Sequence, residues 1–406
     1  MNFVTHLECA NCGQRYEAEH IHNLCTACQR PLWVRYDLDA LKKKFTKKTL
    51  FGRPPTIWRY LEMLPISNPE KIVSLVETIT PILRADRLGA ELGVKELLVK
   101  DESRLPTGSF KARGMALAIS MANHFGIKRV AVPTAGNAGG ALAAYAARAG
   151  MEAYVFMPED TPIINQKECW LAGAKTFLVN GLITDCGRIV GEGKAIKQWF
   201  DVSTLKEPYR IEGKKTMGLE LAEQFDWELP DVILYPTGGG TGLIGMWKAF
   251  AELEAMGWLK SKKKPKMISC QSTGCAPIAT AFEKGERFAK KFENAATVAS
   301  GIRVPAAVGD FMILDAVRES GGVAIATEDK DIPVWMQRGM AAEGIAFCPE
   351  TAVCFGALEV LLRKGTIKPT DRIVVFNTGA AQKYPHATEE VLPHLDIQRP
   401  IEWGKI

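Results

Sequence analysis

The segment Pro-Thr-Gly-Ser-Phe-Lys-Ala-Arg-Gly, residues 106–114, is the stretch around which this chain is organised. It leads into residues 115–122, Met-Ala-Leu-Ala-Ile-Ser-Met-Ala, which favour a helix and are too apolar to face water. Lys111 is therefore expected at the start of a buried helix. Because burial disfavours the charged ammonium, such a lysine can lose its proton and form a Schiff base with an aldehyde. The alternative is that Lys111 is a solvated lysine at the start of a helix and has no catalytic role.

From about residue 96 the chain alternates between apolar, strand-like runs and helical stretches. The predicted strands lie at 97–100, 129–134, 152–158, 175–179, 231–236, 267–271, 323–327 and 371–376, and the predicted helices include 138–149, 163–172, 184–200, 214–226, 242–256 and 350–364. Hydrophobicity in the strands is continuous rather than alternating, which is typical of parallel sheets covered on both faces. We therefore predict an α/β fold with open parallel sheets, in which any second domain is an insertion.

Three loops after predicted strands are rich in glycine or small polar residues, and open α/β sheets bind their ligands at such loops. Residues 133–140 contain Asn137 and either hold a carboxylate on backbone amides or form a tight turn. Residues 236–242, Pro-Thr-Gly-Gly-Gly-Thr-Gly, place four glycines at a helix N-terminus, as in a phosphate cradle. Their spacing matches neither a P-loop nor the dinucleotide-binding fingerprint. Thr378 follows the last strand, where its hydroxyl can bond a neutral ring nitrogen.

Two Cys-x-x-Cys pairs predict a small metal-binding unit from residue 1 to about 36. Twelve residues separate the pairs, whose members are Cys9, Cys12, Cys25 and Cys28. Four thiolates at this spacing suit a tetrahedral, structural zinc site, and so short a unit needs a metal to fold. Two redox pairs, or a degenerate unit that has kept its cysteines, are the alternatives.

Composition narrows the classes of function. The chain has 406 residues, enough for two or three domains, and a formal net charge of +5. No long basic block accompanies that charge, which argues against nucleic acid as the main partner. There is no run of 18 apolar residues and no secretory signal, and the six other cysteines have no framework spacing. We therefore expect a cytoplasmic protein with free thiols and no membrane partner.

The order of these features resembles that of the fold type II, tryptophan synthase β-like pyridoxal-phosphate enzymes, over about residues 55–385. Within that family the chain is most similar to the threonine synthases, in its N-terminal cysteines, Trp58-Arg59-Tyr60, residues 77–83, the Pro-Thr-Gly-Ser-Phe-Lys segment and Arg-Glu-Ser-Gly-Gly at 318–322. The resemblance implies two open parallel-sheet domains and a zinc-ribbon-like unit at 1–36. The large pyridoxal-phosphate-binding domain would comprise 37–106 and 215–406, with a small α/β domain, 107–214, inserted in it.

The resemblance also implies a cofactor, pyridoxal 5'-phosphate, and a role for each site residue. Lys111 would be the Schiff-base lysine and proton shuttle, with Phe110 against the cofactor ring. Asn137 would donate to the phenolic oxygen, and Thr378 would face the pyridine nitrogen. A hydroxyl there leaves the nitrogen unprotonated, which suits elimination and replacement at the β and γ carbons. The cofactor phosphate would be held by Gly238, Gly239, Gly240, Thr241 and Gly242.

Threonine synthases convert O-phosphohomoserine and water to threonine and phosphate, so the resemblance implies a biosynthetic lyase, a phosphorylated amino-acid substrate and a homodimer. Ala112, Ala135 and Ala138, and Ala-Ala-Gln at 380–382, depart from the usual threonine synthase pattern. A threonine/serine dehydratase or another β-eliminating or β-replacing enzyme is one alternative, and a non-catalytic interaction protein is the other. A second anion site would favour the threonine synthase, and its candidate cations are Arg104, Arg113 and Lys383.

Overall fold

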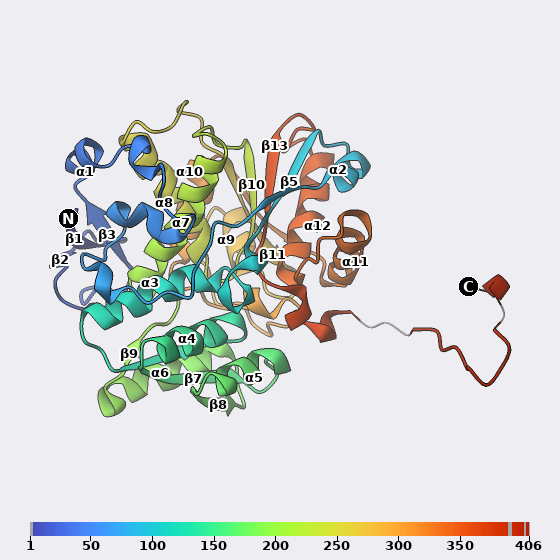
Figure 1. The fold of residues 1–406 in the computed structure, drawn as a ribbon, viewed down its shortest axis with the longest axis horizontal. Coiled ribbons are helices and arrows are strands. Elements are labelled where there is room, and N and C mark those ends of the chain that lie inside the picture. Colours follow the sequence, from blue (N-terminus) through green and yellow to red (C-terminus); the bar gives the residue numbers. More distant parts are fainter. Residues whose placement is uncertain (1–2, 389–391, 402, 406) are drawn as a thin grey trace.

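The computed structural model describes residues 3–388, 392–401 and 403–405, which form three β-sheets (Figure 1). The largest sheet has six strands in the order β12-β11-β10-β13-β5-β4. All neighbouring pairs are parallel except β4 and β5, which are antiparallel. The strands are β4 (Ile82–Arg84), β5 (Glu96–Asp101), β10 (Val232–Pro236), β11 (Lys266–Ser272), β12 (Val323–Thr327) and β13 (Arg372–Asn377).

Alternate residues of the central strands face two separate cores, because successive side chains of a strand point to opposite faces. Ile233 and Val374 pack on one side, and Leu234 and Val375 on the other. Burial on both sides explains the continuous hydrophobicity of these strands. The helices of the first core are α7 (Tyr209–Gln224), α8 (Thr241–Ala255), α9 (Pro277–Glu283) and α10 (Asp310–Glu319), and those of the second are α2 (Asp86–Leu92), α11 (Ile332–Glu343) and α12 (Pro349–Arg363).

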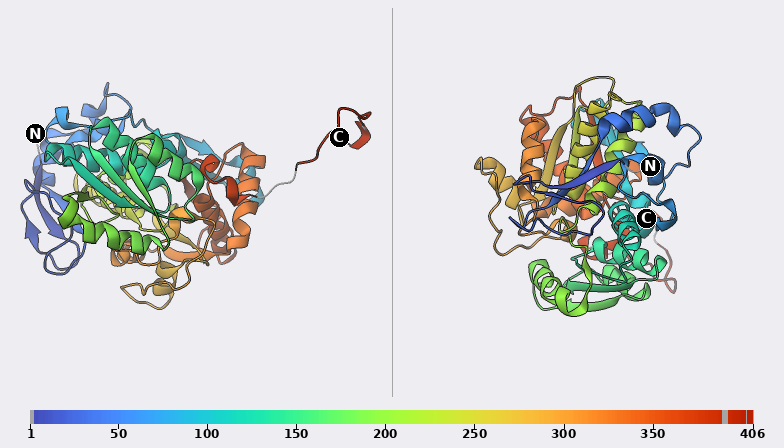
Figure 2. Two further views of the ribbon diagram at one scale, coloured as in Figure 1. Left: turned by 90° about the horizontal axis from the view of Figure 1, so that it is seen from below. Right: turned by 90° about the vertical axis from the view of Figure 1, so that its left-hand side faces the viewer.

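A second, all-parallel sheet has the strand order β8-β7-β6-β9. Its strands are β6 (Arg129–Pro133), β7 (Glu152–Pro158), β8 (Lys175–Val179) and β9 (Phe200–Asp201). Helices α3 (Lys111–His124) and α4 (Asn137–Arg148) share a core with one face, and α6 (Ile183–Lys197) packs on the other, with α5 (Ile163–Leu171) beside α4. This sheet and its helices form a layer beside the large sheet, with α3 packed against both α4 and α7 (Figures 1 and 2).

The N-terminal segment forms a small antiparallel sheet, β2-β1-β3, followed by α1 (Leu38–Lys44). Its strands are β1 (Val4–Cys9), β2 (Arg15–Tyr16) and β3 (Leu32–Tyr36). The sheet has no closed core of its own. Its buried Leu7 and Leu32 pack with Leu117 and Met121 of α3, the helix that Lys111 begins.

The predicted α/β class with two parallel sheets is confirmed. Each of the eight predicted strands and six predicted helices has a counterpart within a few residues, while the elements that were not predicted include β9 and helices α2, α9, α10 and α11. The domain boundaries at 36/37, 106/107 and 214/215 stay a prediction. Among the described residues, no helix is both long and apolar enough to cross a membrane.

Candidate active site

A cavity lies between the two parallel sheets. It is bordered by the start of α3 and by the loops that follow β6, β10 and β13, so each predicted ligand loop contributes to it. All nine residues predicted to hold the cofactor line this cavity, namely Phe110, Lys111, Asn137, Gly238, Gly239, Gly240, Thr241, Gly242 and Thr378. The fold therefore brings the predicted site together, and the role of each residue stays a prediction.

Lys111 is the first residue of α3 and is partly exposed to the cavity. Its ammonium lies 4.2 Å from the centre of the Phe110 ring and has no hydrogen-bond partner among the described residues. Burial lowers the pKa of Lys111 to about 7, helped by the charge of Arg210 and opposed by Glu350 and Cys348. A large share of this amine is therefore unprotonated at neutral pH, as a nucleophile requires.

Lys214 is a second buried amine beside Lys111. Its Nζ donates to the Phe110 carbonyl and lies 4.1 Å from the centre of the Phe110 ring. Burial lowers the pKa of Lys214 well below its usual value, and the charge of Lys111 lowers it further. Lys214 is not among the residues that line the cavity, so Lys111 is the amine that a ligand meets.

The glycine loop after β10 fits a phosphate group. The amides of residues 238–240 donate to no group among the described residues, and they lie at the N-terminus of α8. Free amides combined with a helix dipole attract an anion. Thr241 adds a hydroxyl that has no partner in the described part of the chain. Gly240 has a φ of 74°, and a Cβ there would lie 2.3 Å from Ile313 Cδ1, so the loop needs glycine at this position.

Asn137 begins α4 and is held by three neighbours. Its Nδ2 donates to the Tyr384 hydroxyl at 2.8 Å, and its Oδ1 accepts from Asn165 Nδ2 at 3.0 Å and from Lys383 Nζ at 3.1 Å. One amide hydrogen remains for a ligand, because Nδ2 carries two. The side chain is thus fixed in orientation and still able to donate.

Thr378 lies in a pocket of small polar groups on the other side of the cavity. Its backbone amide donates to Thr351 Oγ1 at 3.2 Å, and its hydroxyl is 3.7 Å from Cys348 Sγ. Burial, together with the charge of Glu350, raises the pKa of the Cys348 thiol to about 12. The groups next to the Thr378 hydroxyl are therefore uncharged, as expected beside a neutral ring nitrogen.

Two of the three candidate cations for a second anion site do not reach the cavity. Arg113 is fully buried and forms ion pairs with Glu102 at 2.6 Å and Glu220 at 2.8 Å. Arg104 is largely exposed and pairs with Asp101 at 2.9 Å. Neither residue lines the cavity, so the expectation that either could bind substrate there is not supported.

Lys383 is the candidate cation closest to the site. Its Nζ donates to the Thr107 carbonyl at 2.6 Å and to Asn137 Oδ1, and it is ion-paired with Glu168. The side chain is buried, and it touches the cavity wall through Asn137.

The residues of the cavity wall that were not predicted include Ser300, Glu350 and Tyr384. Ser300 and Glu350 are buried, and each has a side-chain oxygen without a hydrogen-bond partner among the described residues. Glu350 sits in the first turn of α12, where an acidic residue suits the helix dipole, so the sequence gives it an ordinary structural explanation. Ser300 lies in an irregular segment without any strand-to-helix signal.

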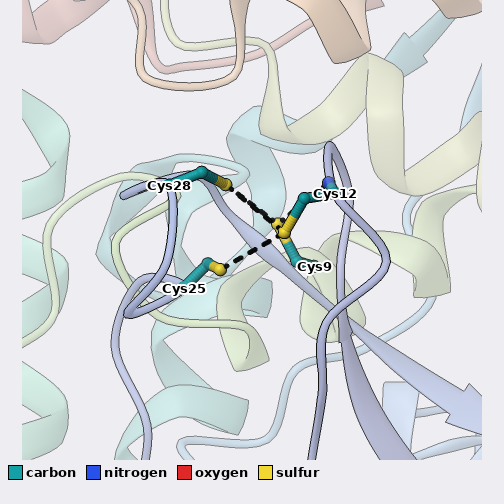
Figure 3. Close-up of side chains that lie close together, drawn as sticks. All are labelled: Cys9, Cys12, Cys25 and Cys28. Carbon is teal, nitrogen blue, oxygen red and sulfur yellow. Dashed lines mark hydrogen bonds between the residues drawn. The ribbon is translucent and has the colours of Figure 1, made fainter.

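The four predicted metal ligands also come together. The Sγ atoms of Cys9, Cys12, Cys25 and Cys28 all lie within 4.8 Å of one another, and the side chains point to a common centre from two loops (Figure 3). Cys9 and Cys28 are 3.4 Å apart, and Cys12 and Cys25 are 3.6 Å apart. Four thiolates 2.3 Å from a tetrahedral zinc ion are separated by roughly 3.8 Å, so the cluster fits such an ion.

Comparisons with known proteins agree with the fold and the site. Residues 73–379 match the family model "Pyridoxal-phosphate dependent enzyme". The chain is 36% identical to a threonine synthase of Methanocaldococcus jannaschii, over 93% of each chain, and 33% identical to one of Methanosarcina acetivorans, over 95% of this chain and 94% of the relative.

Solved structures with the same fold include the Escherichia coli diaminopropionate ammonia lyase, with a TM-score of 0.65 and 20% identity over 78% of this chain and 88% of the other. The processed form of threonine deaminase isoform 2 from Solanum lycopersicum has a TM-score of 0.63 and 22% identity, over 83% of this chain and 95% of the other. These likenesses support the fold, while the family match and the two full-length relatives assign the family. The chain therefore belongs to the fold type II pyridoxal-phosphate dependent enzymes and is a threonine synthase-like member of them.

Proposed function

We propose that this protein converts O-phosphohomoserine and water to threonine and phosphate, with pyridoxal 5'-phosphate bound at Lys111. The observation that carries the proposal is Lys111 itself, an amine with a pKa of about 7 in the same cavity as the free amides of residues 238–240. The two full-length threonine synthase relatives support the choice of reaction.

Each cavity loop would hold one part of the cofactor, whose ring withdraws electrons and so stabilises negative charge on a bound amino acid. Lys111 would bind its aldehyde, and residues 238–242 its phosphate. The remaining amide hydrogen of Asn137 would go to its phenolic oxygen, and the Thr378 hydroxyl to its ring nitrogen. Because Cys348 beside Thr378 is protonated, this thiol does not favour a charged nitrogen.

The reaction requires proton transfers that an amine with a pKa of about 7 can perform in both directions. Three protons come off, from Cα, from Cβ and from the added water. Two are returned, to Cγ and to Cα, and the third leaves on the phosphate as HPO4²⁻. Lys111 would remove and return the proton at Cα.

The phosphate of the substrate needs a cation, and we assign Lys383 to it. Lys383 contacts Asn137 on the cavity wall, and its present partner is the carboxylate of Glu168. Exchange of that carboxylate for a phosphate keeps the ammonium paired. K383M should therefore raise KM for O-phosphohomoserine by at least tenfold, the loss of one charge-assisted contact of about 1.5 kcal/mol or more.

A second candidate function is β-elimination of the threonine/serine dehydratase kind. One observation favours it: the only cationic side chain that lines the cavity is Lys111, so a second phosphate has no preformed counter-ion among the described residues. A dehydratase needs none, since its leaving group is a hydroxyl.

Three further points belong to the proposal. The cysteine cluster would hold one structural zinc ion, since four thiolates leave no open position for catalysis. By resemblance to its family, the protein would work as a homodimer. It would act in the cytoplasm, where its thiols stay reduced.

The test is to incubate the holoenzyme separately with O-phosphohomoserine, threonine and serine, and to measure released phosphate, threonine and keto acid. We expect phosphate and threonine from O-phosphohomoserine, with competitive inhibition by inorganic phosphate. Rapid 2-oxobutyrate formation from threonine, without phosphate release from O-phosphohomoserine, would assign the dehydratase reaction instead.

A further inference from the structure

Glu350 is a buried carboxylate with one oxygen free. It is 3% exposed, lines the cavity, and lies in the first turn of α12. The Gly301 amide donates to its Oε1 at 2.7 Å, whereas Oε2 has no hydrogen-bond partner among the described residues. Leaving a buried charged oxygen unpaired is costly, so its natural partner belongs to the ligand or to the reaction.

A second unpaired oxygen lies on the same loop. Ser300 immediately precedes Gly301, lines the cavity and is 7% exposed, and its Oγ has no partner in the described part of the chain. A carboxylate oxygen that accepts and a hydroxyl that both donates and accepts are the polar partners that hold a single water molecule.

The charged and titratable groups around Glu350 include Lys111, Tyr384 and Cys348. Among the residues that the structure describes, Glu350 and Lys111 are the only charged side chains that line the cavity, and Glu350 raises the pKa of Lys111. Tyr384 and Cys348 also face the carboxylate. Burial followed by the charge of Glu350 raises the pKa of both, so they stay protonated and do not compete as bases.

We propose that Glu350, with Ser300, orients and deprotonates the water molecule that adds to the substrate, as the second acid–base residue of the cavity. The proposal rests on the proposed function, in which a water adds at Cβ after phosphate has left. The water O–H bond breaks as its oxygen bonds to Cβ. The proton passes to Glu350 and is then given up to the released phosphate, which leaves as HPO4²⁻, while Lys111 returns its proton to Cα, so Glu350 ends unchanged. Lys111 cannot serve as this base while it carries the proton taken from carbon.

The proposal predicts where E350Q would fail. Glutamine keeps an oxygen for the Gly301 amide but cannot accept a proton from water. The steps before water addition should continue, and those after it should slow by about 10²–10⁴-fold, the usual contribution of a general base. Unsaturated product should then leave the site and hydrolyse to 2-oxobutyrate.

The experiment compares wild type, E350Q, S300A and E359Q as holoenzymes with O-phosphohomoserine in D₂O. Three quantities are measured: the visible band of the bound cofactor, the exchange of the α-proton by NMR, and the ratio of threonine to 2-oxobutyrate. E359Q removes an exposed carboxylate from the same helix and is the matched control.

For E350Q we expect full cofactor occupancy, α-proton exchange within threefold of wild type, and a ratio of threonine to 2-oxobutyrate at least tenfold lower. S300A should lower the ratio less, and E359Q should leave it unchanged. An E350Q variant with the wild-type ratio, or one that loses cofactor or α-proton exchange, would overturn the assignment of Glu350 alone. A wild-type enzyme that forms no threonine would instead overturn the proposed function, and the role of Glu350 with it.

Discussion

Replacing Gly240 with alanine tests the phosphate cradle through a single methyl group. Gly240 is the residue that precedes α8 and has a φ of 74°, which costs alanine roughly 1–2 kcal/mol. The new Cβ would lie 2.3 Å from both Cδ1 and Cγ1 of Ile313, a fully buried core residue. Overpacking of this kind costs typically about 1–3 kcal/mol. Together these terms predict that G240A lowers the free energy of unfolding by about 2–5 kcal/mol.

The same change should weaken cofactor binding, because the loop can relieve the clash only by moving its free amides. Loss of one charge-assisted hydrogen bond to phosphate is worth about 1.5–3 kcal/mol, or roughly a 10- to 100-fold rise in Kd. The assay is a fluorescence titration of the apoenzyme with pyridoxal 5'-phosphate, beside thermal unfolding with and without cofactor. For a 406-residue chain the stability loss corresponds to a fall in Tm of about 2–6 °C.

Gly191 provides the control. It is an exposed residue within α6, and a Cβ there meets no atom within 4 Å. G191A should raise stability by about 0.5–1 kcal/mol and leave cofactor binding unchanged. A G240A variant that is destabilised but binds cofactor with wild-type affinity would refute the assignment of this loop to the phosphate.

Three further predictions concern other parts of the molecule. Metal analysis should find about one zinc ion per chain in the wild-type protein and less in C25S. C25S should have a lower Tm, while the turnover of its folded fraction should change little. Wild-type protein without zinc would contradict this prediction. R113M should lower stability by about 3–5 kcal/mol in denaturant titration, because it leaves the buried Glu102 without an ion-pair partner and leaves Glu220 with Lys100 alone. R104M should change stability by less than about 1 kcal/mol, and similar losses in both variants would contradict the buried network. Lys111 has a pKa of about 7 in the folded protein and 10.5 in the unfolded chain, so the unfolded state binds more protons between these pH values. The free energy of unfolding of the apoenzyme should therefore rise relative to that of K111M as the pH is raised from 7 to 10.5. If the difference in unfolding free energy between the two proteins did not depend on pH, the pKa of this amine would not be lowered.

Local signals made the cofactor loops predictable from sequence. Several glycines between a strand and a helix indicate a loop whose backbone amides bind an anion, and residues 236–242 contain four glycines in such a position. Lys111 was predictable because the apolar residues 115–122 must be buried, which fixes the environment of the lysine that begins their helix. The order of these features along the chain then identified the family.

The remaining site residues depend on contacts that sequence spacing does not reveal. Arg113 is neutralised by Glu220, a residue on a different helix, so its burial was not foreseeable and it was proposed as a ligand cation. Glu350 reads as an ordinary acidic residue in a first helical turn, and only its pairing with the Gly301 amide shows that one oxygen is left free. The buried face of the N-terminal unit packs on α3, a contact that the spacing of its cysteines does not indicate.

Borohydride reduction of the holoenzyme, followed by peptide mapping, tests the central claim most directly. Lys111 and Lys214 both place an amine about 4 Å from the Phe110 ring, and only Lys111 lines the cavity. The account predicts a reduced pyridoxyl group on Lys111 in the wild-type protein, and no adduct in K111A. An adduct on Lys214 or any other lysine of the wild-type protein, or no adduct at all, would contradict it.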